Sequence, residues 1–391
     1  YFSEDPYLSG KMAAAYVRGI QENGVAACPK HFAVNSQELR RMASNSVLDE
    51  RTLRELYLTA FEIVVKEAHP KSIMSAYNKV NDIYANENHH LLVDILRKEW
   101  GFDGAVVTDW GGSNDHVEGV KNGSTLEMPS PGLGGARKLL KAVAEGSLTE
   151  QEIDLRVDEL LELVLSTTAA MEKAPRKFDE KAHHELARRA AAESIVLLKN
   201  EGGILPLKHG KKVALIGDFA LTPRYQGAGS SMVNPTKVDS LKDAMEAAEL
   251  EMVGYCAGYE RSGKLNQAYL DEAVSQAKMA DVVILCIGLD ESSESEGLDR
   301  THIGIPAAQK QLLDAVTAAN PNVVAVVSAG SVIETDWTEK CKAVVHGYLG
   351  GQAGAGAMLE VLTGWQNPCG KLAETIPLRY EDTPAARYFP G

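Results

Sequence analysis

Apolar residues recur at helical spacing in two long stretches of the first half of the chain. Intervals of three and four residues are typical of a helix with one buried face. Residues 50–67 carry such a stripe, formed by Leu53, Leu56, Tyr57, Ala60, Phe61, Val64 and Val65. Residues 149–171 carry another, formed by Ile153, Val157, Leu160, Leu161, Val164 and Leu165. Thr149 and Glu152 have the spacing of a capping box, so we expect the second helix to begin there.

Short runs rich in β-branched residues alternate with these helical stretches. We predict strands over residues 24–28, 71–76 and 104–108. Strands that alternate with helices in this way are typical of parallel βα units. The first half of the chain is therefore predicted to be an α/β domain with parallel strands.

A polar stretch, residues 172–180, contains Pro175 and separates this pattern from a second one. We place the domain boundary there, with domains at 1–174 and 175–391. In the second domain, predicted strands cover residues 212–216, 281–287 and 322–328, and predicted helices cover 267–279, 306–319 and 351–362. This order predicts an open, mostly parallel sheet with helices on both faces.

Composition and charge narrow the classes of function. The 391 residues are 45% hydrophobic and 24% charged, as expected for a soluble globular protein. A net charge of −14 disfavours nucleic acid and anionic membrane as partners, because both require a basic surface. Cys28, Cys286 and Cys341 lie in or beside apolar runs, so we expect buried thiols and a cytoplasmic location.

Polar and aromatic side chains follow each predicted strand of the first domain. They are Lys30-His31, Tyr77-Asn78 and Asp109-Trp110. Taken singly, each has an ordinary explanation, such as a helix cap for the aspartate or core packing for the tryptophan. The carboxyl ends of parallel strands share one face, however, so these groups are expected to converge. Cations, a carboxylate and an aromatic ring on one face of the sheet are suited to bind a sugar, whose ring can stack on the aromatic side chain and whose hydroxyl groups can bond to the charged ones.

The second domain has an unusually long connection between a predicted strand and helix. Residues 289–300 are acidic and serine-rich, and connections of this kind usually have two to six residues. The loop leaves the carboxyl end of a parallel strand, where open sheets bind their ligands. A solvated acidic loop without a function remains the alternative.

A glycine-rich segment, residues 227–231, suggests a nucleotide site only weakly. It does not follow its strand as GxGxxG, and the sequence contains no GxxxxGK[ST] segment. We therefore do not expect a nucleotide.

Together these segments resemble glycoside hydrolase family three, in particular its β-glucosidase branch. Lys-His-Phe at 30–32, followed by Asn-Ser-Gln-Glu at 35–38, is similar to the family's sugar-binding segment. Ser-Ala-Tyr-Asn at 75–78 is similar to the segment whose tyrosine contacts the nucleophile. Residues 101–110 match the nucleophile signature, and Ser-Glu-Gly-Leu-Asp-Arg at 295–300 resembles the acid/base loop.

The resemblance implies the fold and the roles of individual residues. Residues 1–174 would form the C-terminal portion of a (β/α)8 barrel, and residues 175–391 an α/β sandwich with the acid/base loop. The implied activity is that of a retaining exo-β-glucosidase that acts on terminal non-reducing β-D-glucosyl residues without a cofactor or metal. The implied roles are Asp109 as nucleophile, Glu296 as acid/base, and Lys30, His31, Tyr77 and Trp110 as sugar-binding residues. Tyr77 would also donate a hydrogen bond to the Asp109 carboxylate.

Two departures from the family pattern refine this expectation. Ala-Val-Asn at 33–35 replaces the Pro-Gly of the N-acetylglucosaminidase branch, which carries an Asp-His acid/base just beyond it, so that branch is disfavoured. Residues 1–6 resemble a stretch well inside the barrel, so we expect an upstream segment from the same gene or another chain. Residues 387–391 resemble the approach to a third, fibronectin-like domain.

Two other functions remain open. A β-xylosidase or arabinofuranosidase of the same family would use the same catalytic residues. A catalytically inactive sugar-binding homologue is the alternative from another class, although the presence of both Asp109 and Glu296 argues against it. The expected partner is a small carbohydrate or glucoside, and self-association is left open.

Overall fold

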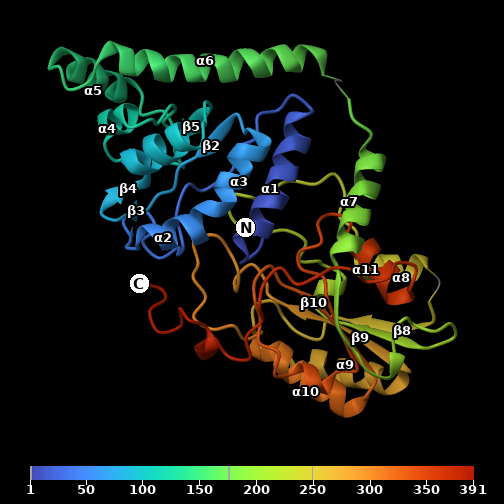
Figure 1. The fold of residues 1–391 in the computed structure, drawn as a ribbon. Helices are drawn as coiled ribbons and strands as arrows, with labels where there is room; N and C mark the ends of the chain where they lie inside the picture. Colours follow the sequence, from blue (N-terminus) through green and yellow to red (C-terminus); the bar gives the residue numbers. More distant parts are fainter. Residues whose placement is uncertain (1, 175–176, 249) are drawn as a thin grey trace. The chain divides into compact units, whose positions relative to one another are not determined.

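The computed structural model describes residues 2–174, 177–248 and 250–391. It divides into two compact units (Figure 1), Tyr1–Arg176 with Pro390–Gly391, and Lys177–Phe389. The predicted boundary adjoins residues 175–176, which lie outside the described residues. Each unit is described by itself below.

The first unit begins with a helix and then alternates short strands with helices (Figure 1). Its elements are α1 Pro6–Gln21, β1 Asn45–Ser46, α2 Glu50–Thr52, the π-helical η1 Leu53–Leu58, α3 Thr59–Ala68, β2 Ser72–Met74, β3 Lys79–Val80, β4 Ile83–Tyr84, the 3₁₀ turn η2 Ala85–Glu87, the π-helical η3 His90–Glu99, β5 Ala105–Val107, α4 His116–Lys121, α5 Leu133–Ala144 and α6 Glu150–Lys173.

Four parallel extended segments form the centre of this unit, in the order 27–32, β2, β5 and 125–128. The amide of Met74 in β2 donates to the carbonyl of Pro29 at 3.0 Å. β2 pairs with β5 in parallel register, and Val107 of β5 forms a parallel bridge with Leu126. The predicted strands at 71–76 and 104–108 are confirmed. The predicted strand at 24–28 is displaced, because pairing with β2 extends from Ala27 to Phe32.

The predicted helix over residues 50–67 forms, but its middle turn is π-helical. The Thr59 hydroxyl donates to the carbonyls of Arg54 and Glu55, both at 2.9 Å, which suits the wider turn. The widening moves the buried face by part of a turn. Leu58 is therefore buried, while Leu56, predicted to face the core, is 50% exposed.

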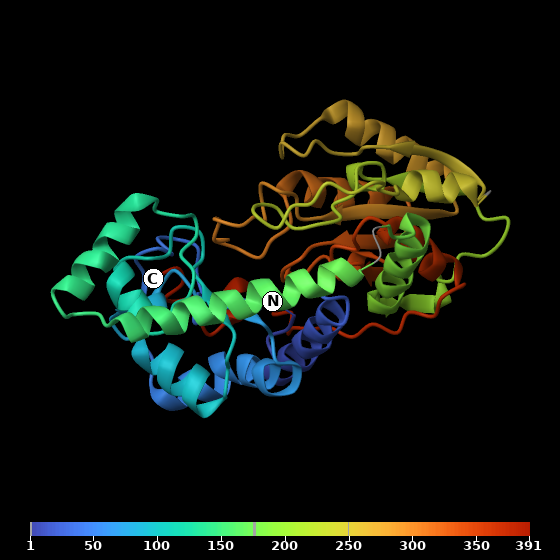
Figure 2. The same cartoon turned by 90° about the horizontal axis from the view of Figure 1, so that it is seen from above.

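The long helix α6 begins as predicted, with both hydrogen bonds of the Thr149–Glu152 capping box present. Within the part of the chain that the structure describes, no residue of α6 is buried. Its predicted core stripe is instead largely exposed at Val157, Leu161, Val164 and Leu165. Figure 2 shows α6 as one long, straight helix.

A partly buried ion cluster attaches α6 to the rest of the first unit. Glu159 of α6 accepts from Arg97 at 2.9 Å, from Arg156 at 2.7 Å and from the Thr125 hydroxyl at 2.5 Å. Burial raises the pKa of Glu159 and lowers the pKa of Arg97 to about 10. The helix is thus held by charge and hydrogen bonds at a site largely withdrawn from water.

The second unit is a six-stranded sheet between two layers of helices (Figure 1). The strand order is β6-β11-β10-β9-β7-β8, and only β6 is antiparallel to its neighbour. Its elements are α7 Glu180–Ser194, β6 Val196–Asn200, η4 Glu201–Gly203, β7 Val213–Ile216, η5 Asp218–Ala220, α8 Leu241–Ala247, β8 Met252–Cys256, α9 Gln267–Met279, β9 Val282–Gly288, α10 Ala307–Ala319, β10 Val323–Ser328, η6 Thr338–Lys340, β11 Ala343–His346, α11 Gly354–Thr363 and η7 Tyr380–Asp382.

Buried apolar residues cover both faces of this sheet. Helices α9 and α10 pack on one face, and α7, α8 and α11 pack on the other. Every residue of β7, β9 and β11 is buried, as expected for strands covered on both sides. The predicted strands and helices of this domain are confirmed, and the mostly parallel sheet with them.

The cysteines only partly follow expectation. All five are free thiols, and Cys286 and Cys341 are buried as predicted. Cys28, predicted to be buried, is exposed, because side chains alternate along an extended segment and its neighbour Ala27 takes the buried side.

Candidate active site

Asp109 lies at the carboxyl end of β5, where the sequence places it, and its side chain is only 14% exposed. Its Oδ1 accepts the backbone amide of Trp110 at 2.6 Å. Its Oδ2 lies 3.2 Å from Nε2 of His31, at the end of another of the parallel segments. The structure thus brings Asp109 and His31 together and holds the carboxylate from both oxygens.

Tyr77 is bonded to the turn that carries Asp109, at an acceptor that differs from expectation. Its hydroxyl donates to the main-chain carbonyl of Trp110 at 2.8 Å. A tyrosine hydroxyl carries one proton, so this bond leaves none to donate to Asp109. The predicted Tyr77–Asp109 bond is therefore wrong for this structure, and Tyr77 instead fixes the turn on which Asp109 lies. The turn leaves little room for a side chain at position 112, because a Cβ added to Gly112 would lie 3.3 Å from the Tyr77 ring.

The other two predicted binding residues present their side chains to solvent. Trp110 is 63% exposed, so its ring is accessible to a ligand rather than packed in the core. Lys30 is also exposed, next to His31. An exposed indole beside a carboxylate is the arrangement expected for stacking a sugar ring.

Arg41 is a member of this cluster that the sequence did not indicate. Its guanidinium lies 4.9 Å from the centre of the Tyr77 ring, and it pairs with Glu38 at 2.9 Å. Glu38 is the last residue of the Asn-Ser-Gln-Glu segment at 35–38. An arginine three residues beyond Glu38 was the available signal, but only the fold places it over Tyr77.

A second carboxylate lies at the same edge of the parallel segments. Glu127 belongs to segment 125–128, next to β5, and its Oε2 lies 2.7 Å from Nδ1 of His116. Both side chains are less than a fifth exposed. Glu127 was missed because residues 125–128 lack the β-branched run of a recognisable strand.

The acidic loop of the second unit leaves β9 and is anchored where it begins. Asp290 is buried, and its Oδ1 accepts from the Ser292 hydroxyl at 2.7 Å and from the Ser293 amide at 2.8 Å. Ser292 and Ser293 therefore hold the start of the loop in place. Further along, Arg300 donates to the carbonyl of Val332 at 2.6 Å.

The three glutamates of this loop have different partners. Glu291 pairs with Arg261 at 3.4 Å, and Oε2 of Glu294 accepts the Gly330 amide at 3.0 Å. Oε2 of Glu296 accepts the Ser230 amide at 2.5 Å. Glu294 and Glu296 both line an open cavity with Arg224, Arg300, Tyr380 and Phe389. This cavity lies wholly within the second unit.

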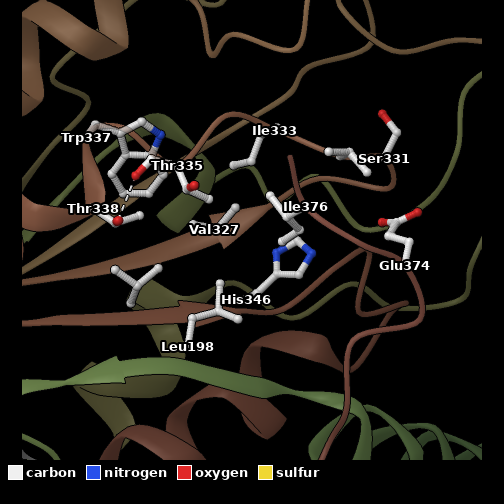
Figure 3. A pocket seen from close by; sticks show the side chains of 12 residues that line it. Leu198, Val327, Ser331, Ile333, Thr335, Trp337, Thr338, His346, Glu374 and Ile376 are labelled. Atoms are coloured by element: carbon white, nitrogen blue, oxygen red, sulfur yellow. Dashed lines mark hydrogen bonds between the residues drawn. The ribbon is translucent and has the colours of Figure 1, made fainter. Parts of the chain in front are cut away.

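A second, smaller pocket lies beside β10 and β11 and shares Ser331, Val332 and Glu374 with that cavity. Figure 3 shows the imidazole of His346 pointing into it. Burial lowers the pKa of His346 to about 4, so the ring is neutral at pH 7. Trp337 lines the pocket with a buried indole nitrogen that has no hydrogen-bond partner among the residues that the structure describes. The pocket is otherwise mostly apolar and does not have the character of a sugar site.

The part of the chain that the structure describes has neither a cluster for a metal ion nor a membrane-spanning helix. Within these residues, no cluster of three or more His, Cys, Asp or Glu side chains could hold a metal ion. No described helix combines the length and the apolar character needed to cross a membrane.

Comparison with family models assigns both halves of the chain. Residues 1–163 match the glycosyl hydrolase family 3 N-terminal domain, and residues 195–390 match the glycosyl hydrolase family 3 C-terminal domain. The chain belongs to glycosyl hydrolase family 3. The resemblance inferred from the motifs is thereby confirmed.

Two relatives illustrate the range of activities found among family 3 proteins similar to this chain. It is 46% identical to the thermostable β-glucosidase B of Acetivibrio thermocellus over 395 residues, covering 100% of this chain and 52% of that protein. It is 43% identical to an exo-α-(1→6)-L-arabinopyranosidase of Bifidobacterium longum over 402 residues, covering 100% and 53%. The chain spans about half the length of these relatives.

Solved family 3 structures share the fold. A β-glucosidase from Bifidobacterium adolescentis superposes with a TM-score of 0.96 at 42% identity, over 100% of this chain and 58% of that one. β-Glucosidase 3B from Thermotoga neapolitana, solved with glucose, gives a TM-score of 0.90 at 31% identity, over 100% and 59%. The predicted fold class, part of a (β/α)8 barrel followed by an α/β sandwich, is confirmed.

Proposed function

We propose that the protein is a retaining exo-β-glucosidase that releases terminal non-reducing β-D-glucosyl residues by double displacement. The observation that carries this proposal is the Asp109 carboxylate, held at a strand end by His31 and the Trp110 amide beside an exposed indole. High identity to a thermostable β-glucosidase supports the choice of glucose.

The reaction needs a nucleophile and one proton carrier. Asp109 attacks the anomeric carbon while Glu296 gives its proton to the departing glycosidic oxygen, so the C–O bond to the aglycone breaks as the bond to Asp109 forms. Glu296 then takes a proton from water, which attacks the anomeric carbon and frees Asp109. Both groups are side chains of this chain, so the chemistry requires no cofactor.

The remaining predicted residues bind the sugar. Trp110 offers a stacking face, while Lys30 and His31 donate hydrogen bonds to hydroxyl groups. Tyr77, with Arg41 over its ring, keeps the Asp109 turn in place. A small glucoside is thus the proposed partner.

We also propose that an upstream segment, from the same gene or another chain, completes the barrel. Closure of this barrel requires eight parallel strands, and the described residues supply four parallel segments. The exposed apolar stripe of α6 is the surface on which further helices of a barrel would pack. The share of the relatives that this chain spans, 52% and 53%, is in accord with this proposal.

One observation favours a second substrate class. The Bifidobacterium longum relative is named for an L-arabinopyranoside, a five-carbon sugar, at 43% identity. A panel of 4-nitrophenyl glycosides on the full-length enzyme separates the alternatives. We expect β-D-glucoside to give the highest kcat/KM. A preference for β-D-xyloside or an arabinoside would replace glucose as the substrate, and no turnover of any member would favour an inactive sugar-binding homologue.

We further propose a cytoplasmic location. The buried free thiols of Cys256, Cys286 and Cys341 support a reducing compartment. Fractionation of the source cells, with activity recovered outside the cytoplasm, would contradict this.

A further inference from the structure

We infer that the glycine-rich segment at residues 227–231 is the element that positions Glu296, with Gly229 and the Ser230 amide as its positioning residues. We call this segment the glycine loop. The inference rests on the proposed role of Glu296 as acid/base. It gives a task to a motif that the nucleotide interpretation could not explain.

Two hydrogen bonds join Glu296 to the glycine loop. The Ser230 amide donates to Glu296 Oε2 at 2.5 Å, and the Glu296 amide donates to the carbonyl of Ala228 at 3.1 Å. One bond fixes the main chain at Glu296 and the other fixes its carboxyl group. Neither bond involves a side chain of the glycine loop, so the backbone path of the loop determines both.

Only glycine suits position 229 in this arrangement. Its φ of +107° lies in a region that residues with a side chain rarely adopt. An added Cβ would lie 2.5 Å from Cβ of Glu296 and 2.6 Å from Oε2. The loop can therefore approach the glutamate closely enough for both bonds only because Gly229 has no side chain.

The loop is itself braced. The Gln226 side chain accepts from the Val233 amide at 3.0 Å and donates to the Val233 carbonyl at 3.1 Å, which ties together the residues that flank the loop. Arg224, whose side chain is 2% exposed, donates to the carbonyls of Gln226 and Glu294. One buried guanidinium thus joins the residue that precedes the glycine loop to the acidic loop.

This arrangement assigns different tasks to the two carboxyl oxygens of Glu296. An amide N–H can only donate, so Oε2 must accept from Ser230 and cannot direct a proton toward it. The C=O oxygen of a protonated carboxyl is the stronger acceptor, so the bond from Ser230 favours Oε1 as the oxygen that carries the catalytic proton. Oε1 then gives this proton to the glycosidic oxygen in the first step and takes one from water in the second. The Ser230 amide remains bound to the carboxylate in between.

The test compares two glycine substitutions in the full-length enzyme. Gly229→Ala introduces the Cβ beside Glu296, whereas Gly263→Ala adds one at a φ that is also positive, +74°, but in open space. The readout is kcat/KM for 2,4-dinitrophenyl glucoside, which needs little protonation, against phenyl glucoside, which needs much. We expect Gly229→Ala to lose at least 10-fold more activity on phenyl glucoside than on the dinitrophenyl substrate. For Gly263→Ala, the kcat/KM relative to wild type should be the same on both substrates.

A second variant removes the donor itself. Ser230→Pro has no amide hydrogen, so it should show the same leaving-group selectivity. Equal losses on both substrates in Gly229→Ala and Ser230→Pro, or no loss, would overturn the inference. Glu296→Ala measured in parallel separates the two claims: if it lacks leaving-group selectivity, the acid/base assignment fails, and if it alone shows selectivity, only the role of the glycine loop fails.

Discussion

Nε2 of His31 lies 3.2 Å from Oδ2 of Asp109, although the two residues lie at the ends of different parallel segments, separated by β2. The contact exists because both segments end at the same face of the sheet. With Oδ1 bound to the Trp110 amide, the carboxylate is fixed in one orientation before any substrate arrives. Such preorganisation is what a nucleophile in a retaining glycosidase requires.

Removal of the Asp109 carboxylate should abolish turnover while leaving the fold intact. Asp109→Gly is expected to lower kcat by several orders of magnitude, because no covalent intermediate can form. Added azide should then attack from the vacated face and give the α-glycosyl azide, identified by NMR. Asp103→Asn, at an exposed carboxylate before β5, is the control and should keep its activity. Wild-type-like turnover in Asp109→Gly would contradict the assignment.

Replacement of Glu296 should affect substrates according to their leaving groups. Glu296→Ala is expected to slow phenyl glucoside by about 10²-fold or more beyond its effect on 2,4-dinitrophenyl glucoside, since general acid catalysis contributes on this scale. Glu291→Ala and Glu294→Ala test the competing carboxylates of the same loop, and Glu127→Gln tests the one beside His116. If any of these shows the selectivity and Glu296→Ala does not, the proton donor has been misassigned.

The Glu159 cluster should be the main attachment of α6. Glu159→Gln leaves Arg97 and Arg156, whose side chains are 13% and 12% exposed, without their counter-charge, and removal of one partner from a fully buried ion pair costs at most about 3–5 kcal/mol. We expect a loss of that order in the free energy of unfolding, measured by urea denaturation. Glu162→Gln, exposed on the same helix, should change it by less than about 0.5 kcal/mol. Equal effects of the two substitutions would refute the attachment.

His346 should make the stability of the second unit sensitive to acid. The folded protein resists protonation of this ring down to about pH 4, whereas the unfolded chain takes up the proton near 6.5. The unfolded state therefore binds more protons between these values, and stability is lost as the pH falls from about 6.5 to 4, by on the order of 3 kcal/mol. Thermal unfolding of His346→Gln should show a smaller drop over this range than the wild type. Parallel curves for the two proteins would contradict this.

Much of the fold could be predicted because local pattern and final environment agree. β9 and β10 are continuous apolar runs and are buried on both faces, so composition alone indicates them. Leu56 shows where pattern fails: regular periodicity points it inward, but the π-helical turn exposes it and buries Leu58 instead. The segment at 125–128 is held by its neighbour β5 rather than by its own propensity, so it could not be recognised.

In the site too, residues marked by their neighbours in the sequence could be predicted, whereas contacts made only by the tertiary fold could not. Asp109 could be identified because it directly follows a recognisable strand and precedes a tryptophan. Arg41 over Tyr77, and Ser230 against Glu296, join residues distant from each other in the chain, and no local signal encodes such pairs. The Tyr77 hydroxyl was assigned to the wrong acceptor because the Trp110 carbonyl becomes available only when the turn has formed.

Covalent trapping of the nucleophile tests the central claim most directly. The full-length enzyme is incubated with 2,4-dinitrophenyl 2-deoxy-2-fluoro-β-D-glucoside, which forms the glycosyl-enzyme but hydrolyses slowly, and the labelled peptide is sequenced by mass spectrometry. The account predicts one fluoroglucosyl group per protein, attached to Asp109. Attachment to another carboxylate, Glu127 in particular, would contradict it.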